Sequence, residues 1–335
     1  MKNVAVVGAT GAVGIVMRQV LKERNFPLKK ISFFSSERSH GKKIQFKGES
    51  FRAQVLNESS FDKGDIEIAL FSIPAQASKL FAPIAAKNGA IVIDNSSAFR
   101  MDPEVPLVVP EVNAHAVSRH KGIIANPNCS TIEVVQVIKP LHDAARIKRM
   151  VVTTFQSVSG VSLQAMDELR QETRAVLEDE EYQRQIFPHQ IAFNLIPQIP
   201  QENAFGANLY TTEEMKLVDE TRKILEDDSL RITATNVRVP VLRGHSASVN
   251  IETEKKLTVE ETKQLLSETP GIVVQDDPAR QIYPMPAFAT DKDETFVGRI
   301  REDESVPCGL NLWIVSDNLR KGAATNAIQI AELLL

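Results

Sequence analysis

The stretch Val4-Ala5-Val6-Val7-Gly8-Ala9-Thr10-Gly11-Ala12-Val13-Gly14 decides the fold of the first part of the chain. Val4–Val7 is a short apolar run typical of a buried strand, and Val13–Leu21 has apolar residues at helical spacing. Glycines at the spacing G-x-x-G-x-x-G permit a tight turn and a close backbone approach to a pyrophosphate at the start of a helix. The alternative is a strand–helix turn without a ligand. The expected cofactor contacts here are Gly8, Thr10, Gly11, Ala12, Val13 and Gly14.

The pattern around this stretch indicates a Rossmann-like α/β fold. Short apolar runs at Ile31–Phe34, Glu67–Phe71 and Ile91–Ile93 alternate with helical patterns such as Ala77–Ala86. Continuous apolar runs suit parallel strands that are buried on both faces. Strands that alternate with helices favour a doubly wound parallel sheet.

The rest of the chain predicts a second, α+β domain with an antiparallel sheet. We expect its strands and helices in these segments: Val151–Thr154, Leu163–Gln185, Arg231–Pro240, Ala247–Glu252 and Leu312–Val315. Gly322–Leu335 has a strong apolar helix pattern. We therefore place a dinucleotide-binding domain at residues 1–130, completed by a C-terminal helix at 317–335. Residues 131–316 form the expected catalytic and dimerisation domain.

Length and composition narrow the class of protein. The chain has 335 residues, of which 43% are apolar and 24% charged, with a formal net charge of −4. This profile suits two globular domains and gives no reason to expect a nucleic acid partner. No apolar run approaches the roughly 20 residues of a membrane span, and the N-terminus lacks the layout of a signal peptide. With two cysteines and no metal-ligand spacing, we expect a cytoplasmic protein without a metal.

The residues after the second predicted strand bear on the choice of nicotinamide cofactor. NAD binders usually place an acidic residue there, whereas NADP binders have small or basic residues. The strand ends at Phe34, and Ser36, Arg38 and Ser39 follow. These side chains are expected to hold a 2′-phosphate. Although Glu37 lies among them, it falls beyond the usual acidic position, so the sequence favours NADP over NAD.

Cys129 is the candidate nucleophile. It follows Asn128, a plausible N-cap, and precedes an apolar helical stretch, Ile132–Ile138, that we expect to end at Pro140. A thiol in the first turn of a helix is expected to have a lowered pKa, which favours the thiolate that acyl transfer needs. The alternative is a buried, inert cysteine. Cys308 has neither a helix start nor a base near it in the sequence, so it is expected to be inert.

A cysteine nucleophile needs a base, and the sequence offers six histidines without choosing among them. A dinucleotide fold combined with one cysteine and one histidine matches the logic of glyceraldehyde-phosphate dehydrogenase. In that logic a thiolate attacks a carbonyl, and the nicotinamide adds or removes hydride.

Motifs along nearly the whole chain resemble those of the aspartate-β-semialdehyde dehydrogenase family, in the same order. They are Gly8–Gly14, Asn95–Arg100, Pro127–Thr131, Gln156–Gly160, Glu213–Lys216, Arg238–His245 and Ser316–Ala324. The set is specific although no single motif is.

The resemblance implies a role for individual residues. Cys129 would be the acylated nucleophile, Gln156 would orient the acyl intermediate, and His245 would be the general acid/base. Arg238 would bind the substrate α-carboxylate, and Glu213 its amino group. The remaining residues would bind phosphate (Arg100, Asn128 and Lys216) or lie near the cofactor (Gly160, Gly322 and Ala323). Arginine has the planar fork that matches a carboxylate, and residues 213 and 216 share a face if they are helical. Taken singly, each of these residues also has a simpler interpretation. Glu213 and Lys216 could be an ion pair on a solvated helix face. Arg238 could belong to a surface ion pair, and Arg100 could be a charged residue in a loop.

Two segments depart from the family pattern. Ser72–Gln76 stands where the family usually has Ser-Ala-Gly-Gly, and Pro74 with its bulkier neighbours is expected to reduce close backbone approach to the cofactor. Val161-Ser162 replaces the usual Ala-Gly after Gly160. Neither departure removes a proposed catalytic residue.

The resemblance implies an amino-acid biosynthetic enzyme, serving lysine, threonine and methionine. It would catalyse the reversible, NADP-dependent reductive dephosphorylation of L-4-aspartyl phosphate to L-aspartate 4-semialdehyde through a Cys129 thioester. It would be a homodimer, with a homotetramer as the alternative. Three alternatives stay open: an N-acetyl-glutamyl-phosphate reductase, a malonyl-CoA reductase, or a non-catalytic NADP-binding homologue.

Overall fold

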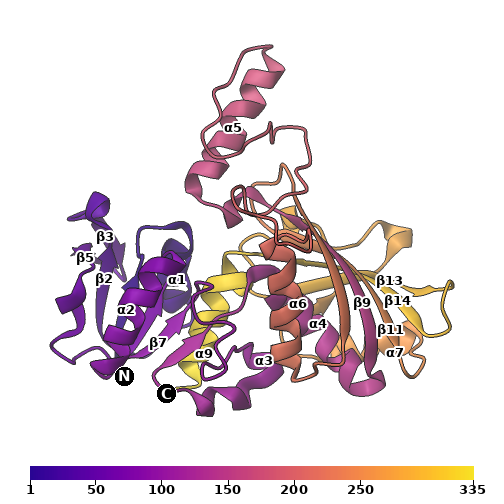
Figure 1. Cartoon of the computed structure of the whole chain (residues 1–335), viewed down its shortest axis with the longest axis horizontal. Helices are drawn as coiled ribbons and strands as arrows, with labels where there is room; N and C mark the ends of the chain where they lie inside the picture. The colour runs from indigo at the N-terminus through magenta and orange to yellow at the C-terminus, as the bar shows by residue number, and fades with distance from the viewer. The chain divides into compact units, whose positions relative to one another are not determined.

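The chain forms two compact units. The computed structural model describes residues 1–335. One unit comprises Met1–Asn128 together with Ala323–Leu335, and the other comprises Cys129–Gly322. Figure 1 shows the elements of each unit, from indigo at the N-terminus to yellow at the C-terminus.

The first unit contains a six-stranded parallel sheet in the order β5-β2-β1-β6-β7-β8. Its strands are β1 (Lys2–Val7), β2 (Leu28–Ser35), β5 (Gln54–Val55), β6 (Ile68–Phe71), β7 (Ile91–Asp94) and β8 (Ile123–Ala125). Helices α1 (Ala12–Glu23) and α2 (Ala75–Lys87) are crossover connections, and β3 (Lys43–Phe46) pairs with β4 (Glu49–Arg52) in a separate hairpin. The predicted Rossmann-like fold is confirmed, because β2 and β6 flank β1 on opposite sides and so create a topological switch point.

The second unit is built on a mixed six-stranded sheet in the order β10-β9-β11-β14-β13-β12. Its strands are β9 (Ile147–Gln156), β10 (Arg231–Arg238), β11 (His245–Thr253), β12 (Ile272–Val274), β13 (Thr295–Asp303) and β14 (Gly309–Ser316). The expectation of an antiparallel sheet was wrong for two pairs, since β9 with β10 and β12 with β13 are parallel. A long crossover through α5 (Leu163–Leu177) and α6 (Thr212–Leu225) joins β9 to β10, and a crossover of this length permits parallel pairing.

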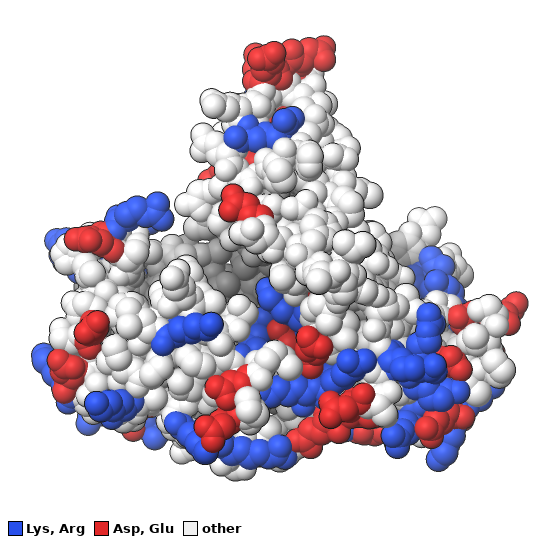
Figure 2. All heavy atoms as spheres, in the orientation of Figure 1, with Lys and Arg blue, Asp and Glu red and all other residues white.

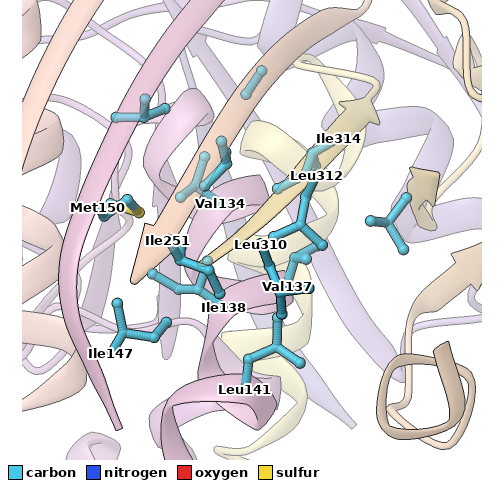
Figure 3. Close-up of a cluster of buried hydrophobic side chains, with 14 of the residues drawn as sticks. Val134, Val137, Ile138, Leu141, Ile147, Met150, Ile251, Leu310, Leu312 and Ile314 are labelled. Carbon is cyan, nitrogen blue, oxygen red and sulfur yellow. The ribbon is translucent and has the colours of Figure 1, made fainter. Parts of the chain in front are cut away.

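Helix α4 (Cys129–Ala145) packs on the second sheet and forms the core of that unit. Figure 3 shows Val134, Val137, Ile138 and Leu141 of this helix against apolar side chains of the strands. The prediction that the helix ends at Pro140 was wrong, because α4 continues to Ala145. Leu141 and Ala145 are both buried and extend the apolar face beyond the proline. Their burial offsets the backbone hydrogen bond that proline cannot make.

An arm made of α5 and the loop after it extends from the second unit (Figure 1). The predicted helix Leu163–Gln185 ends early, at Leu177. Four acidic residues follow, Glu178–Glu181, and Asp179 has a positive φ of 54°. Negative charge at a helix C-terminus opposes the helix dipole, so this run favours termination. Figure 2 shows acidic side chains at the tip of the arm.

Two buried carboxylates of α5 hold the loop of the arm. Glu168 accepts hydrogen bonds from the backbone N–H groups of residues 185–187, at 2.8 to 3.0 Å. Glu172 accepts from the N–H groups of Ile191 and Ala192 and from Arg184 Nε. These acceptors replace the sheet or helix partners that this loop lacks.

The end of the chain differs from the predicted continuous helix Gly322–Leu335. A wide π-helical turn, η6 (Arg320–Thr325), comes first, and α9 (Asn326–Glu332) follows. In the first unit, Asn326 Nδ2 donates to Asn126 Oδ1 at 2.7 Å and to the carbonyl of Val108 at 2.9 Å. These buried bonds anchor α9 to the segments beside β8.

Candidate active site

Three strand ends bring side chains to one edge of the second sheet. Gln156 is the last residue of β9, Arg238 is the last of β10, and His245 is the first of β11. Arg238 is in register with Gln156 across the parallel pair. On the other side of β9, the antiparallel β11 pairs Ser246 with Phe155, so His245 begins beside the end of β9. Residues far apart in the sequence therefore meet at the end of β9, which lies between β10 and β11.

Cys129 is the first residue of α4 and belongs to the same unit. It forms no disulfide, and the residue is half-buried. Gly322 lies against it, because a Cβ at position 322 would come within 3.0 Å of the Cys129 Cβ. Cys308 is also free and half-buried, but it lies just before β14, at the start of a different strand.

Arg238 is a buried guanidinium that is incompletely satisfied. It is 3% exposed, and its Nη1 donates to the carbonyl of Ser157 at 2.7 Å, whereas its Nε has no partner. Burial lowers the pKa of Arg238, and the charges of Glu213 and Cys129 act in the opposite direction. A guanidinium so enclosed by protein attracts an anion.

His245 is fully buried, and its ring nitrogens have different surroundings. Nδ1 accepts the backbone N–H of Ser157 at 3.0 Å, while Nε2 has no partner. Burial lowers the pKa of His245 to about 3, and the positive charge of Arg238 contributes, so the imidazole is neutral at neutral pH. A Cβ on Gly160 would lie 3.3 Å from Nε2 and from Arg238 Nη1, so the glycine leaves room beside both groups.

Glu213 completes this cluster from α6. Its Oε2 accepts from Lys216 Nζ at 3.0 Å, which confirms that the two side chains share a helix face. Its Oε1 lies 3.5 Å from Gln156 Nε2. The Glu213 side chain is 8% exposed and that of Lys216 is 32% exposed. A buried carboxylate and a more exposed ammonium thus lie next to each other.

Sequence reasoning assigned no role to a buried polar network behind His245. Asn318 lies within 3.1 Å of Ser157 Oγ and Ser159 Oγ, and its Oδ1 accepts the backbone N–H of Gly244. The motifs Gln156–Gly160 and Ser316–Ala324 contained these residues. Their partnership is not visible in the sequence, because Ser157 and Asn318 are far apart along the chain.

Glu133 is a second group that sequence reasoning missed. It lies four residues after Cys129 on α4 and is 1% exposed, and neither carboxyl oxygen has a partner. Burial raises the pKa of Glu133 well above its ordinary value, which favours the neutral carboxylic acid over the carboxylate.

Two predicted phosphate ligands, Arg100 and Asn128, belong to the first unit. Arg100 is buried, and its Nε donates to the carbonyl of Asn126 at 3.0 Å while its Nη2 donates to that of Asn95 at 2.7 Å. Asn128 is also buried and directly precedes Cys129 in the chain. The bonds of Arg100 fix it in the loop after β7 rather than on the surface.

The glycine-rich turn of the first unit fits a dinucleotide. Gly8 has φ +87°, and a Cβ there would lie 2.1 Å from the carbonyl oxygen of Ser72. A Cβ at Gly14 would lie 2.2 Å from the carbonyl oxygen of Gly8. Gly11, the N-cap of α1, is exposed and provides no capping side chain, so the first N–H groups of the helix face outward at Ala12 and Val13. Such an open N-terminus suits a pyrophosphate.

The turn after β2 stands next to this site. Ser36, Glu37 and Arg38 are exposed, Ser39 is half-buried, and residues 37–39 form a short 3₁₀ turn. Since β1 and β2 are adjacent and parallel, their carboxyl ends lie at the same edge of the sheet. In the departing segment, Pro74 serves as the N-cap of α2, a position that loses no helical hydrogen bond.

Other site classes lack support. No group of three or more His, Cys, Asp or Glu side chains has a geometry that could hold a metal ion. No helix combines the length and apolar character that crossing a membrane requires.

Family models match both units. Residues 3–120 match the NAD binding domain of semialdehyde dehydrogenase, and residues 138–321 match its dimerisation domain. The first match supports a nicotinamide cofactor, and the second supports an oligomer.

Individual proteins are similar over their full length. Aspartate-semialdehyde dehydrogenase from Aquifex aeolicus is 52% identical over 336 residues, covering 99% of this chain and 98% of the relative. The enzyme of that name from Bacillus subtilis is 50% identical, with 99% and 97% covered.

Solved structures agree with this likeness. The structure of aspartate semialdehyde dehydrogenase II from Vibrio cholerae complexed with ASA has a TM-score of 0.95 and 47% identity, covering 100% of this chain and 98% of that one. The enzyme with NADP from Candida albicans has a TM-score of 0.75 and 26% identity, covering 100% and 98%. The chain is therefore an oxidoreductase that belongs to the aspartate-semialdehyde dehydrogenase family.

Proposed function

We propose that this chain catalyses the reversible reductive dephosphorylation of L-4-aspartyl phosphate to L-aspartate 4-semialdehyde and phosphate, through a thioester on Cys129. The observation that carries the proposal is the cluster of Cys129, Arg238, His245 and Glu213 within one unit. Each of these groups matches one part of the substrate. Cys129 matches the acyl carbon, Arg238 the α-carboxylate, His245 the carbonyl oxygen and Glu213 the α-ammonium group.

Arg238 and Glu213 recognise the amino acid end of the substrate. The partnerless Nε of Arg238 donates to the α-carboxylate, which supplies the anion that this buried guanidinium lacks. Glu213 accepts a hydrogen bond from the free α-ammonium group. An acetylated nitrogen carries no positive charge, so this pairing disfavours N-acetyl-glutamyl phosphate.

Cys129 carries the acyl group. Its thiolate attacks the C4 carbonyl carbon, and the tetrahedral intermediate collapses with loss of inorganic phosphate to leave a thioester. Gln156 orients the acyl group, and His245 acts at the substrate oxygen as the acid/base group. Lys216, Arg100 and Asn128 bind the phosphate that leaves. Proton or charge handling by a positioned side chain contributes roughly 100- to 10,000-fold.

NADP is the cofactor in this proposal, and reduced nicotinamide supplies the hydride that converts the thioester into the aldehyde. The open N-terminus of α1 holds the pyrophosphate, while Ser36, Arg38 and Ser39 hold the 2′-phosphate. We assign further contacts to Gly160, Gly322 and Ala323. The unit of residues 1–128 and 323–335 is thus the dinucleotide-binding domain, and residues 129–322 are the catalytic and dimerisation domain of a homodimer.

The decisive experiment replaces Cys129. We expect Cys129→Ala to lower phosphate-dependent reduction of NADP with aspartate semialdehyde by about 10⁴-fold or more, while the dissociation constant for NADP stays unchanged. Cys308→Ala is the matched control, since it removes the other half-buried thiol, and it should leave turnover intact. Retained turnover in Cys129→Ala would refute the thioester.

Substrate and cofactor choice are tested on the wild-type enzyme. Activity with aspartate semialdehyde but not with N-acetylglutamate semialdehyde or malonyl-CoA is expected. Glu213→Gln should raise KM for aspartate semialdehyde. A preference for NADH over NADPH would remove the phosphate role of Arg38, and NADP binding without any turnover would indicate a non-catalytic homologue.

A further inference from the structure

The hydrogen bonds of His245 fix where its proton resides. A backbone N–H can only donate, so Nδ1, which receives the Ser157 N–H at 3.0 Å, must present its lone pair. In the neutral ring the proton then lies on Nε2. Nε2 has no partner and faces the space that Gly160 leaves open.

Asn318 holds both sides of this arrangement. Its Oδ1 accepts the N–H of Gly244, the residue before His245, at 3.0 Å. The same oxygen accepts the hydroxyl of Ser157 at 3.1 Å, and Nδ2 donates to Ser159 Oγ at 3.0 Å. The Ser157 Oγ is itself 3.1 Å from Nδ1 of His245. One buried amide thus connects the backbone that carries the imidazole with the residue that donates to it.

We propose that Asn318 is a positioning residue that acts through Gly244 and Ser157 to keep the His245 proton on Nε2, directed at the reacting oxygen of the substrate. This rests on the proposed function and narrows the role of His245 within it. With the proton on Nε2, the ring can donate to the oxygen of each tetrahedral intermediate.

Thiolate attack on the acyl phosphate moves an electron pair onto the carbonyl oxygen, and that pair re-forms the carbonyl as phosphate leaves. Hydride addition to the thioester gives a second oxyanion, which collapses to aldehyde and regenerates the thiolate. Each oxyanion needs a hydrogen-bond donor, and preorganised donors of this kind are each worth about 100- to 1,000-fold.

The charged groups that face His245 agree with a neutral ring. Arg238 at the end of β10 disfavours a second positive charge, and Glu213 on α6 favours it more weakly. Nδ1 accepts a hydrogen bond from the backbone N–H of Ser157. An imidazolium carries a proton on Nδ1 as well, so it would lose this hydrogen bond. The ring is therefore suited to donate from Nε2.

The test combines kinetics with nitrogen NMR. In the full-length enzyme, Asn318→Ala should lower kcat about 10- to 100-fold with little change in KM for aspartate semialdehyde. In a His245→Ala background the same substitution should cause no further loss, since a residue that works through His245 has nothing left to position. With ¹⁵N-labelled histidine, wild-type His245 should show a protonated Nε2 and an unprotonated Nδ1.

Controls separate positioning from folding. Asn250→Ala on β11 also removes a half-buried amide, one that donates to Asp303 and Asn311, and it should leave kcat unchanged. Ser157→Ala keeps the backbone donor and should lose less than Asn318→Ala. If Asn318→Ala does not fold, the tautomer of the wild-type ring still decides the matter.

Three outcomes would overturn the inference: a wild-type proton on Nδ1, an equal loss from Asn318→Ala with and without His245, or wild-type turnover in Asn318→Ala. Wild-type turnover in His245→Ala would be a different result, because it would remove His245 from the proposed function itself.

Discussion

The arm around α5 and the catalytic edge of the second sheet both bury ionisable side chains, but these side chains differ in whether the protein supplies their hydrogen-bond partners. In the arm, Glu168 and Glu172 each receive several hydrogen bonds from the loop that they hold. At the catalytic edge, Arg238 Nε and His245 Nε2 have no partner within the protein. Buried polar groups whose hydrogen-bond partners come from the protein stabilise a fold. Buried polar groups without such partners cost stability and are available to a ligand.

Removing Arg238 should damage activity far more than stability. We expect Arg238→Ala to lower kcat/KM about 100- to 1,000-fold, because the substrate carboxylate loses its buried partner. The free energy of unfolding should change by less than about 1 kcal/mol, since a poorly satisfied buried charge is also removed. Steady-state kinetics and urea unfolding measure the two effects. Arg231→Ala, at the exposed start of the same strand, is the control, and a large loss of stability in Arg238→Ala would contradict the comparison.

Removing Glu172 should have the reverse effect. Glu172→Ala leaves the N–H groups of Ile191 and Ala192 without their acceptor, so we expect a loss of about 2–4 kcal/mol in the stability of the arm. Faster limited proteolysis within residues 178–192 and local hydrogen exchange would report it. Glu181→Ala, at the exposed tip, should change neither. An arm that stays equally protected would show that these bonds are dispensable.

The buried imidazole should make the enzyme sensitive to acid. Because the folded-state pKa of His245 is lowered to about 3 from 6.5, the unfolded chain binds a proton first as the pH falls. Stability is therefore lost below pH 6.5, by about 2 kcal/mol between pH 7 and pH 5 from this group alone. Unfolding of His245→Gln at both pH values should lack this contribution. An identical decline in both proteins would argue against a neutral buried ring.

The smallest effect is expected for Glu133, where the prediction concerns the sign of the change in the free energy of unfolding. Its folded-state pKa is raised, so the unfolded chain releases a proton that the folded chain keeps as the pH rises above 4.5. Glu133→Gln should therefore be more stable than the wild type at pH 7, and the gain should disappear below pH 4.5. Denaturant titrations at the two pH values decide this. A loss at pH 7 would indicate that the carboxyl group has a partner in solution.

Local sequence predicted the elements whose causes are local. The apolar run before Gly8 and the periodic helix after it identified β1 and α1, because strand, turn and helix signals all fall within about 20 residues. The end of α5 was missed because the charged and polar composition of the predicted helix continues to Gln185, although its apolar spacing ends at Leu177. The end of α4 was wrongly predicted at Pro140. There the tertiary packing of the buried Leu141 overrides the local helix-breaking tendency of proline.

The site was less accessible to sequence reasoning than the fold. The family motifs singled out Cys129, Arg238 and His245, and the structure brings these three into one cluster, while their roles remain predictions. The partners of His245 could not be predicted from the sequence. Ser157 and Asn318 are far apart along the chain, and no spacing pattern connects them. The parallel pairing of β9 and β10 depends on the long crossover between them and was equally invisible.

Gln156, Arg238 and His245 lie at strand termini, so the sheet that supports them is distinct from the loops that adjoin them. Each Cα is held by the last rung of the backbone ladder, next to the point where a loop begins or ends. Insertions or replacements in those loops can change the surroundings of these side chains to suit a longer or bulkier acyl group, without repacking the interior. A scaffold of this kind lets related enzymes diverge in what they accept while retaining one set of reacting groups.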